Sequence, residues 1–247
     1  MITQGLDDHA HARTLSRPFD HDPELPVIAP PSARPTLERA SSFRRVEYIA
    51  SRTRRVALPY LGLDTLPPIR LPPSRAPSEA IVRPRGGANG GGGGLRVQST
   101  QGALVGPPWQ RRENGYVFRA AEGGGCPSIY LEPHVEFDPD ELAQLAPVDA
   151  VITPIQGQSL PGFELVHGAS ASTELVSRLR PRWVVPMDNG AVEARGLSAP
   201  FVNEVGARAE FEARLSATGS RTAELVEVRP GEPFTLTLVS GARGDAT

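Results

Sequence analysis

Side chains able to bind a metal or move a proton gather in four short stretches, residues 4–11, 106–116, 129–134 and 184–190. Each stretch mixes acids, imidazoles or amides and lies at the end of a segment that is expected to be a strand. In layered α/β folds, the loops at strand ends converge on one crevice, where ligands bind. We therefore expect the four stretches to meet in a single site.

The first and third stretches carry the histidines best suited to metal binding. Asp8, His9 and His11 offer oxygen and nitrogen donors within one loop, and such donors bind divalent metals. Solvated loop histidines are the alternative for this short spacing. His134 follows a proline at a strand end, so we expect its imidazole to be held in a rigid turn. A half-buried structural histidine is the alternative there.

The other candidate ligands have less specific surroundings. Asp188 opens an Asp-Asn-Gly sequence, which alone predicts only a turn. Asp7 and Asp8 are equally suited to capping the helix that is expected to follow them. His21 and His167 have no partners in the sequence, and we interpret them as surface residues.

Composition excludes several classes of protein and mechanism. All 26 basic residues are arginine, so mechanisms that need a lysine, such as Schiff bases and P-loops, are excluded. A net charge of −2 argues against a general nucleic-acid binder, and no stretch reaches the roughly 18 apolar residues that a membrane span needs. The single cysteine, Cys126, excludes an internal disulfide framework and a multi-cysteine zinc module, and it favours a reducing compartment.

Short Val- and Ile-rich runs predict strands, and runs with helical apolar spacing predict helices. The expected strands are 26–29, 46–49, 54–58, 95–99, 115–120, 128–131, 150–154, 183–186 and 225–228. The expected helices are 12–17, 33–41, 139–145, 171–179, 199–206 and 207–218. Asp138 before Pro139 predicts a helix start, and Leu175, Val176 and Leu179 share one helical face. This alternation favours sheets layered with helices.

Proline and glycine concentrate between residues 59 and 94. Residues 66–74 hold too many prolines to continue a helix or a central strand, and residues 85–94 have almost no side chains to bury. We predict a flexible insertion at 59–94, with a short strand near 79–82, inside a single domain of residues 1–240. A glycine-rich phosphate cradle is the alternative, although a strand and not a helix is expected to follow it. Residues 241–247 are expected to form a disordered tail.

These stretches, in this order, resemble the metallo-β-lactamase superfamily. The sequence is most similar to a branch of metallo-hydrolase-like proteins of plants, algae and cyanobacteria, and distantly similar to bacterial ascorbate-phosphate lactonases. The resemblance covers roughly residues 1–205 outside the insertion. It is carried by Ile2–His11, Leu25–Ala33, Gly106–Gln110, Glu113–Tyr116, Ile129–His134, Val148–Pro154 and Val184–Gly190. The fold that it implies is α+β, a four-layer αββα sandwich.

The resemblance also implies an altered metal signature. The superfamily pattern His-x-His-x-Asp-His corresponds here to Gln4-x-Leu6-x-Asp8-His9. Leu6 cannot bind a metal and Gln4 is a poor ligand, so the usual first metal position is compromised. Asp8 and His9, which typically serve the second position, are retained.

The later family ligands are changed as well. The next histidine of the family corresponds to the Gly-Pro-Pro of residues 106–108, which offers no ligand. The implied metal ligands are Asp8, His9, His134 and Asp188, with His11 or Glu132 assisting. Mixed imidazole and carboxylate ligands suit one zinc, manganese or iron ion, zinc and manganese above all, better than a zinc pair. A di-iron redox site would need more ligands than remain.

In the family fold, several strands precede the signature, whereas this sequence begins one strand-length before it. We therefore expect either an incomplete first sheet or an N-terminally truncated sequence. An incomplete sheet exposes an unpaired edge and an apolar face, which soluble proteins avoid. We favour truncation for that reason.

The resemblance implies a metal-dependent hydrolase that cleaves a small ester, lactone or phosphodiester through a metal-bound hydroxide. The substrate could also carry a negative charge. Asp8 would act as ligand or as catalytic general base. Arg111, Arg112 and Asn114 would line the pocket and bind an anionic group, with a solvated loop as the alternative for the arginines.

The alternative function is a catalytically silent member of the same fold, which serves as a binding or scaffold module and holds no metal. The loss of two signature histidines favours it. For both functions we expect an intracellular, soluble protein of the cytoplasm or a plastid. Its partner would be a small molecule, with no nucleic acid or membrane involved, and the oligomeric state is left open.

Overall fold

The structure of the protein is a computed structural model. It describes residues 1–5, 9–19, 22–40, 43–52, 55–56, 69–70, 74–83, 93–105, 111–122, 127–161, 163–187, 199–218, 223–229 and 232–236. Among these residues, no helix combines the length and the apolar character that crossing a bilayer requires.

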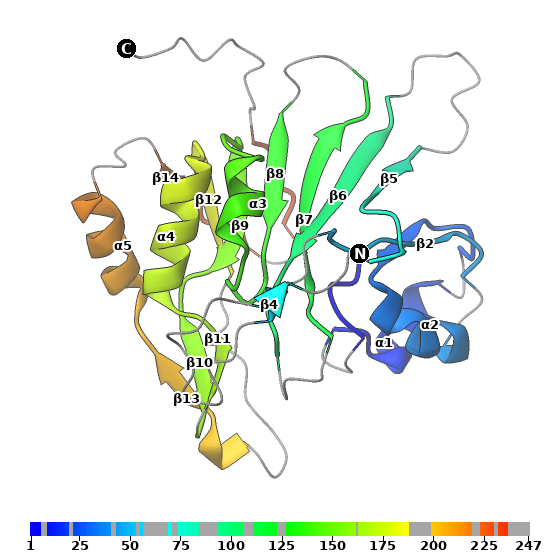
Figure 1. Ribbon diagram of the computed structural model, residues 1–247, viewed down its shortest axis with the longest axis horizontal. Coiled ribbons are helices and arrows are strands. Elements are labelled where there is room, and N and C mark those ends of the chain that lie inside the picture. The colour runs from blue at the N-terminus through cyan, green and yellow to red at the C-terminus, as the bar shows by residue number, and fades with distance from the viewer. Residues whose placement is uncertain are drawn as a thin grey trace.

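A mixed seven-stranded sheet forms the centre of the molecule (Figure 1). Its strand order is β14-β12-β9-β8-β7-β6-β5. Strands β5 to β8 pair antiparallel, whereas β8, β9, β12 and β14 run parallel. The bounds are β5 Glu79–Val82, β6 Leu95–Gln101, β7 Asn114–Ala120, β8 Ser128–Leu131, β9 Ala150–Pro154, β12 Trp183–Met187 and β14 Glu224–Leu225.

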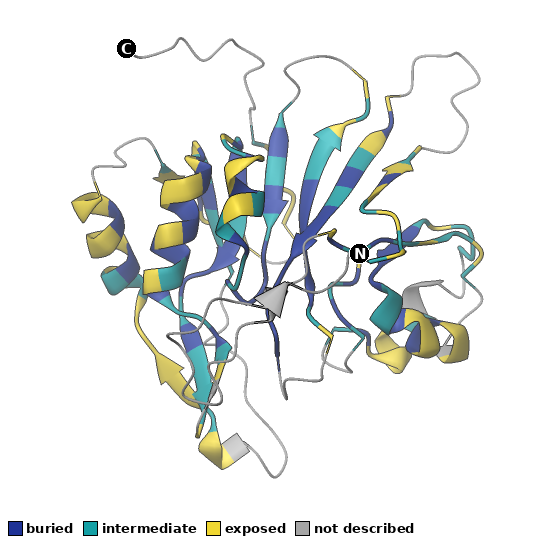
Figure 2. Cartoon of the chain, in the orientation of Figure 1, coloured by how far each residue is buried: buried dark blue, intermediate teal, exposed yellow. Residues whose placement is uncertain are grey.

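Three helices cover one face of this sheet, α3 (Pro139–Ala143), α4 (Ala169–Leu179) and α5 (Arg208–Ala217). Figure 2 shows their buried sides turned toward the strands. Leu175 and Leu179 of α4 pack with Val117 of β7 and Tyr130 of β8, while Val176 packs with Phe211 of α5. The apolar face expected for α4 is therefore confirmed. Asp138 caps α3 as predicted, because its carboxylate accepts hydrogen bonds from two backbone N–H groups of the first turn.

The opposite face carries a small second sheet and two more helices. Strands β1 (Val27–Ala29) and β2 (Val46–Tyr48) pair in parallel, and α1 (Ala12–Phe19) and α2 (Arg34–Ala40) lie beyond them. Ile28 packs with Tyr116 of the large sheet, whereas Val27 and Ala29 pack with Leu37 of α2. Successive residues of β1 thus face opposite layers.

The layers run helix, large sheet, small sheet, helix, which confirms the predicted four-layer αββα sandwich. In the described part of the chain the second sheet has two strands, and the expectation of an incomplete first sheet or a truncated sequence stays a prediction.

A third sheet projects beyond the ends of β8, β9 and β12 (Figure 1). It is antiparallel, with β10 (Gly157–Leu160) between β11 (Phe163–Val166) and β13 (Asn203–Val205). The helix predicted over 199–206 is wrong: this segment forms a short 3-10 helix, η3 (Ala199–Phe201), and then β13. Pairing of β13 with β10 outweighs the weak local helical pattern, which contains a proline and two valines.

Much of the predicted insertion lies outside the described residues, as does the predicted tail of 241–247. The short strand expected near 79–82 is confirmed as β5, the edge strand that pairs with β6. Two further two-residue strands, β3 (Arg55–Val56) and β4 (Ile69–Arg70), pair with each other. A 3-10 helix, η1 (Pro31–Ala33), leads into α2.

Two residues of β7 anchor other parts of the chain to the large sheet: Tyr116 holds the N-terminal segment and Asn114 holds the residue after β2. The hydroxyl of Tyr116 donates a hydrogen bond to the backbone oxygen of Ile2 at 2.7 Å, and the Asn114 side-chain amide donates to the backbone oxygen of Ile49 at 2.8 Å. Tyr116 is fully buried, and this burial raises the pKa of its phenol, so the hydroxyl keeps the proton that it donates. The start of the chain is therefore fixed by buried polar contacts.

Replacing Tyr116 with phenylalanine should destabilise the protein by about 1–2 kcal/mol, because the buried oxygen of Ile2 loses its donor. Urea denaturation of the two proteins measures this difference. Tyr48→Phe is the matched control, because phenylalanine keeps the half-buried ring over which the Arg34 guanidinium lies. An equal loss in both variants would contradict the anchoring role.

Gly115 of β7 makes room for a buried polar group behind the strand. A Cβ atom at this position would lie 2.4 Å from Oγ1 of Thr100, 2.6 Å from a carboxylate oxygen of Glu132 and 2.8 Å from the Tyr130 hydroxyl. The Tyr130 hydroxyl lies 3.2 Å from Oγ1 of Thr100 and donates to Glu132 at 3.3 Å. Only glycine allows these three side chains to meet here.

Gly115→Ala should lower the free energy of unfolding by about 1–3 kcal/mol, the usual effect of overpacking a core. Thermal or urea unfolding measures the loss. Gly93→Ala serves as the control, because a Cβ atom there meets nothing within 4 Å. If alanine at 115 were tolerated as well as alanine at 93, the tight packing around β7 would be wrong.

Candidate metal centre

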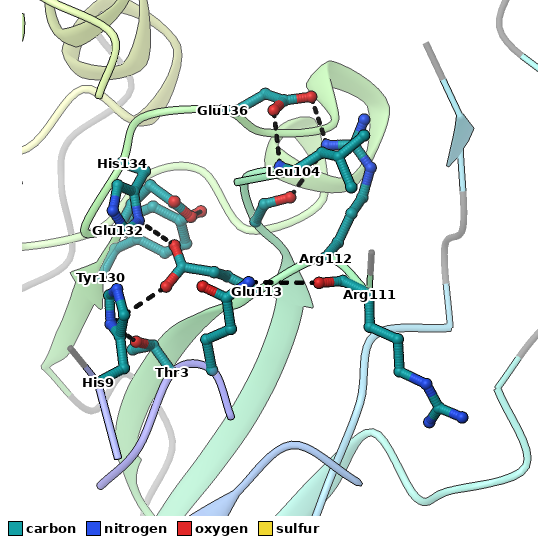
Figure 3. Close-up of polar contacts among 12 residues, drawn as sticks. Thr3, His9, Leu104, Arg111, Arg112, Glu113, Tyr130, Glu132, His134 and Glu136 are labelled. Carbon is teal, nitrogen blue, oxygen red and sulfur yellow. Dashed lines mark hydrogen bonds and ion pairs between the residues drawn. The ribbon is translucent and has the colours of Figure 1, made fainter. Parts of the chain in front are cut away.

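Three side chains from distant parts of the sequence meet at one end of the large sheet (Figure 3). They are His9 from the segment before α1, Glu113 at the start of β7, and His134 just after β8. Each offers one ligand atom, and these atoms all lie within 4.8 Å of one another. Among the described residues this is the one group of three such side chains.

Strand pairing brings Glu113 and His134 together. Strands β7 and β8 are antiparallel, with Tyr116 opposite Leu131. Extending this register by three residues sets Glu113 opposite His134. The meeting of these two side chains thus follows from the pairing of two neighbouring strands.

The carboxylate of Glu113 lies between the two imidazoles. One oxygen forms a short hydrogen bond with Nδ1 of His134, and the other lies 3.3 Å from Nδ1 of His9. The two rings are 5.0 Å apart and tilted by 49°. Because the Glu113 side chain is fully buried, the imidazoles supply the polar surroundings that a buried carboxylate needs.

His9 is held by the anchored N-terminal segment. The backbone N–H of Asn114 donates to the backbone oxygen of Thr3 at 3.0 Å, and the Thr3 hydroxyl lies 2.8 Å from Nδ1 of His9. The start of β7 therefore positions Glu113 directly and His9 through Thr3.

His134 sits in a strained turn. The next residue, Val135, has φ of 61°, in the left-handed region that β-branched residues avoid, and its side chain is buried in the core. Such a conformation costs on the order of 1–3 kcal/mol and persists where the surroundings fix it. The backbone oxygen of His134 also accepts a hydrogen bond from the N–H of His167 at 3.0 Å.

A second buried carboxyl lies beside this group. Glu132 is fully buried, and burial together with the negative charge of Glu113 raises the pKa of Glu132 well above its usual value. Its neutral, protonated form is favoured by this environment. Tyr130, whose pKa burial also raises, donates to it.

The donor set fits a divalent metal ion. Within the described structure, the buried oxygen Oε1 of Glu113 has no hydrogen-bond partner, and neither has Oε1 of Glu132 or of Gln4. Buried oxygens without partners are costly, so each needs an explanation such as a bound ion or water. Two imidazoles and one carboxylate are a ligand set used by catalytic zinc sites, which leave one position open.

The structure places the predicted metal ligands as follows. His9 and His134 come together, whereas Asp8 and Asp188 lie outside the described residues, so their roles stay predictions. His11 is exposed, and its Nδ1 lies 3.0 Å from Oγ1 of Thr14, outside the group around Glu113.

The residues predicted to bind substrate behave differently from one another. Arg111 is exposed and its side chain points away from the histidines (Figure 3). Arg112 pairs with Glu136, and the Asn114 amide is used inside the core. Both side chains therefore bind other parts of the chain and hold its segments together.

The sequence analysis did not single out Glu113, which the structure brings together with His9 and His134. This residue was part of the Glu-Asn-Gly-Tyr phrase, but no ligand was expected between the first and third stretches. An acid directly before a buried strand was the available signal. His167, interpreted as a surface residue without partners, forms a 2.6 Å contact with Glu164 and is half-buried, while His21 lies outside the described residues.

Comparisons with known proteins agree with this architecture. The structure resembles Igni18, a metallo hydrolase from the archaeon Ignicoccus hospitalis, with a TM-score of 0.55 and 15% identity over 96% of this chain and 78% of that one. It also resembles CmlA, a diiron β-hydroxylase from Streptomyces venezuelae, with a TM-score of 0.50 and 16% identity over 91% of this chain but only 42% of CmlA. At these identities the likeness concerns the fold.

The search of curated proteins gave no match. The family described as the beta-lactamase superfamily domain matches residues 1–188, which is most of the chain. The chain therefore belongs to the metallo-β-lactamase superfamily, as the sequence resemblance implied.

Proposed function

We propose that this protein is a metal-dependent hydrolase in which His9, Glu113 and His134 hold one divalent ion, zinc in the first place. The observation that carries this proposal is the buried Glu113 carboxylate: Oε2 forms a hydrogen bond with His134, whereas Oε1 lies 3.3 Å from Nδ1 of His9 but makes no hydrogen bond among the described residues. Asp8 and Asp188 remain proposed additional ligands.

When bound, such an ion lowers the pKa of water toward 7 and polarises the oxygen of a substrate. The chain's own residues prepare the site for this chemistry. Thr3 orients the ring of His9, and Glu113 fixes both imidazoles against each other. Burial and the charge of Glu113 raise the pKa of Glu132, which favours its neutral form and so disfavours two adjacent buried anions.

We propose a small ester or lactone as the substrate, with phosphodiesters next. Arg112 pairs with Glu136. Because its charge is already matched, Arg112 gives less reason to expect an anionic substrate. Arg111 is exposed, and we keep the proposal that its charge binds an anionic group of the substrate. The general base Asp8 is proposed on the family resemblance.

Iron-dependent oxidation is the second candidate function. Two histidines and one carboxylate with open positions also suit non-haem ferrous iron. The described residues offer one such set, which favours a single iron over the pair of irons that the name of CmlA gives for that enzyme. Oxygen consumption by the ferrous protein, set against ester cleavage by the zinc protein, separates the two functions.

Metal titration tests the proposed site. The protein, freed of metal by a chelator, should bind one zinc ion per chain at micromolar concentration or tighter in calorimetry. Glu113→Ala and His134→Ala should each weaken binding by more than about 100-fold, since losing a residue that merely supports a ligand already costs about 10–100-fold. Cleavage of p-nitrophenyl acetate, a γ-lactone and bis-p-nitrophenyl phosphate should fall in parallel.

His11→Ala is the matched control, because it removes an exposed histidine of the same loop. It should bind zinc as the unchanged protein does. Loss of binding in His11→Ala with retention in His134→Ala would contradict the site. Failure of the unchanged protein to bind zinc, manganese or iron at micromolar concentration would leave the scaffold function.

A further inference from the structure

We propose that Arg112 and Glu136 form a positioning clamp that fixes Glu113 and His134 at the spacing needed for metal binding. This inference rests on the proposed function and assigns Arg112 a role other than substrate binding. Arg112 directly precedes Glu113, and Glu136 follows His134 by two residues. The clamp residues therefore flank the two ligands in sequence, one on each segment.

The clamp consists of one contact between the two segments and two contacts from them to residues 102 and 104 (Figure 3). Nη1 of Arg112 donates to Oε1 of Glu136 and, at 3.2 Å, to the backbone oxygen of Gly102. Oε2 of Glu136 accepts a hydrogen bond from the N–H of Leu104 at 2.8 Å. Both carboxylate oxygens of Glu136 are thus engaged, each by a different segment.

The same backbone that contacts the clamp also pairs with Glu113. The N–H of Gly102 donates to the backbone oxygen of Glu113 at 3.1 Å, and the N–H of Glu113 donates to the backbone oxygen of Ala103 at 2.8 Å. Residues 102–104 are therefore held by Glu113 on one side and by Glu136 on the other. A shift of the loop that carries Glu136 would be transmitted to the distance between the two ligands.

The turn between His134 and Glu136 has a backbone conformation that needs support from its surroundings. Val135, the residue between them, has a positive φ of 61°, which a valine does not adopt by itself. Contacts on both sides must hold such a turn. Glu136 supplies them on one side, and the backbone bond from His167 to His134 supplies them on the other.

Burial distinguishes this ion pair from those on the surface. The side chains of Arg112 and Glu136 are 14% and 28% exposed, whereas those of the Arg178 and Glu174 pair on α4 are 42% and 52% exposed. Exposed pairs of the second kind contribute little and are screened by salt. A partly shielded pair with additional backbone partners is better suited to holding a fixed geometry.

Zinc affinity of clamp variants tests the proposal. Arg112→Met should weaken zinc binding about 10–100-fold in competition with a chromophoric chelator, the effect typical of residues that orient metal ligands. Arg112→Lys keeps the charge and should restore most of this affinity, which mere loss of packing would not explain. Arg178→Gln, which breaks the surface pair, should leave zinc affinity unchanged. Wild-type affinity in Arg112→Met would overturn the clamp.

Two further measurements keep the result decisive. If Arg112→Met does not fold, Glu136→Gln replaces it: glutamine still accepts from Leu104 but carries no charge, and the same loss of affinity is expected. If the unchanged protein binds no zinc, the proposed function fails, and the clamp is then judged by hydrogen exchange. The His167 amide should exchange at least about 10-fold faster in the clamp variant, and unchanged exchange would overturn the clamp.

Discussion

A single buried carboxylate, that of Glu113, draws two imidazoles and three separate segments of the chain together. Glu113 is fully shielded from water, so its charge must be met by groups of the protein or by an ion. Three segments have to converge to achieve this. Pairing of β7 with β8 supplies His134, and the polar anchors at Asn114 and Tyr116 supply the segment that carries His9.

The architecture explains how His9, Glu113 and His134 come together. The second sheet has two strands in the described part of the chain, and the N-terminal segment reaches the large sheet through hydrogen bonds to β7. Glu113 directly precedes β7, and its backbone N–H and oxygen are hydrogen-bonded to residues 103 and 102. Gly115 and the strained turn at Val135 show that packing around this strand is tight on both sides of the site.

Sequence patterns predicted the elements more completely than the site. Strand and helix periods depend on local side-chain alternation, so β8, β9 and the apolar face of α4 could be identified directly. The segment 199–206 was mistaken for a helix because its pairing partner, β10, lies far away in sequence and its short hairpin carries little apolar alternation. His9 and His134 stood out by residue type, whereas Glu113 becomes a candidate only when the register of β7 against β8 is known. Arg112 was interpreted as an anion-binding residue because its partner, Glu136, lies in the loop after β8 and is not its neighbour in sequence.

The proposed ligand set can be read from the atoms that surround a bound ion. X-ray absorption at the zinc edge, on protein loaded with one equivalent of zinc, reports those atoms and their distances. We expect two imidazole nitrogens and at least one carboxylate oxygen at about 2.0–2.2 Å, with one imidazole lost in His9→Ala and one in His134→Ala. A spectrum dominated by sulfur, or one that either substitution leaves unchanged, would contradict it.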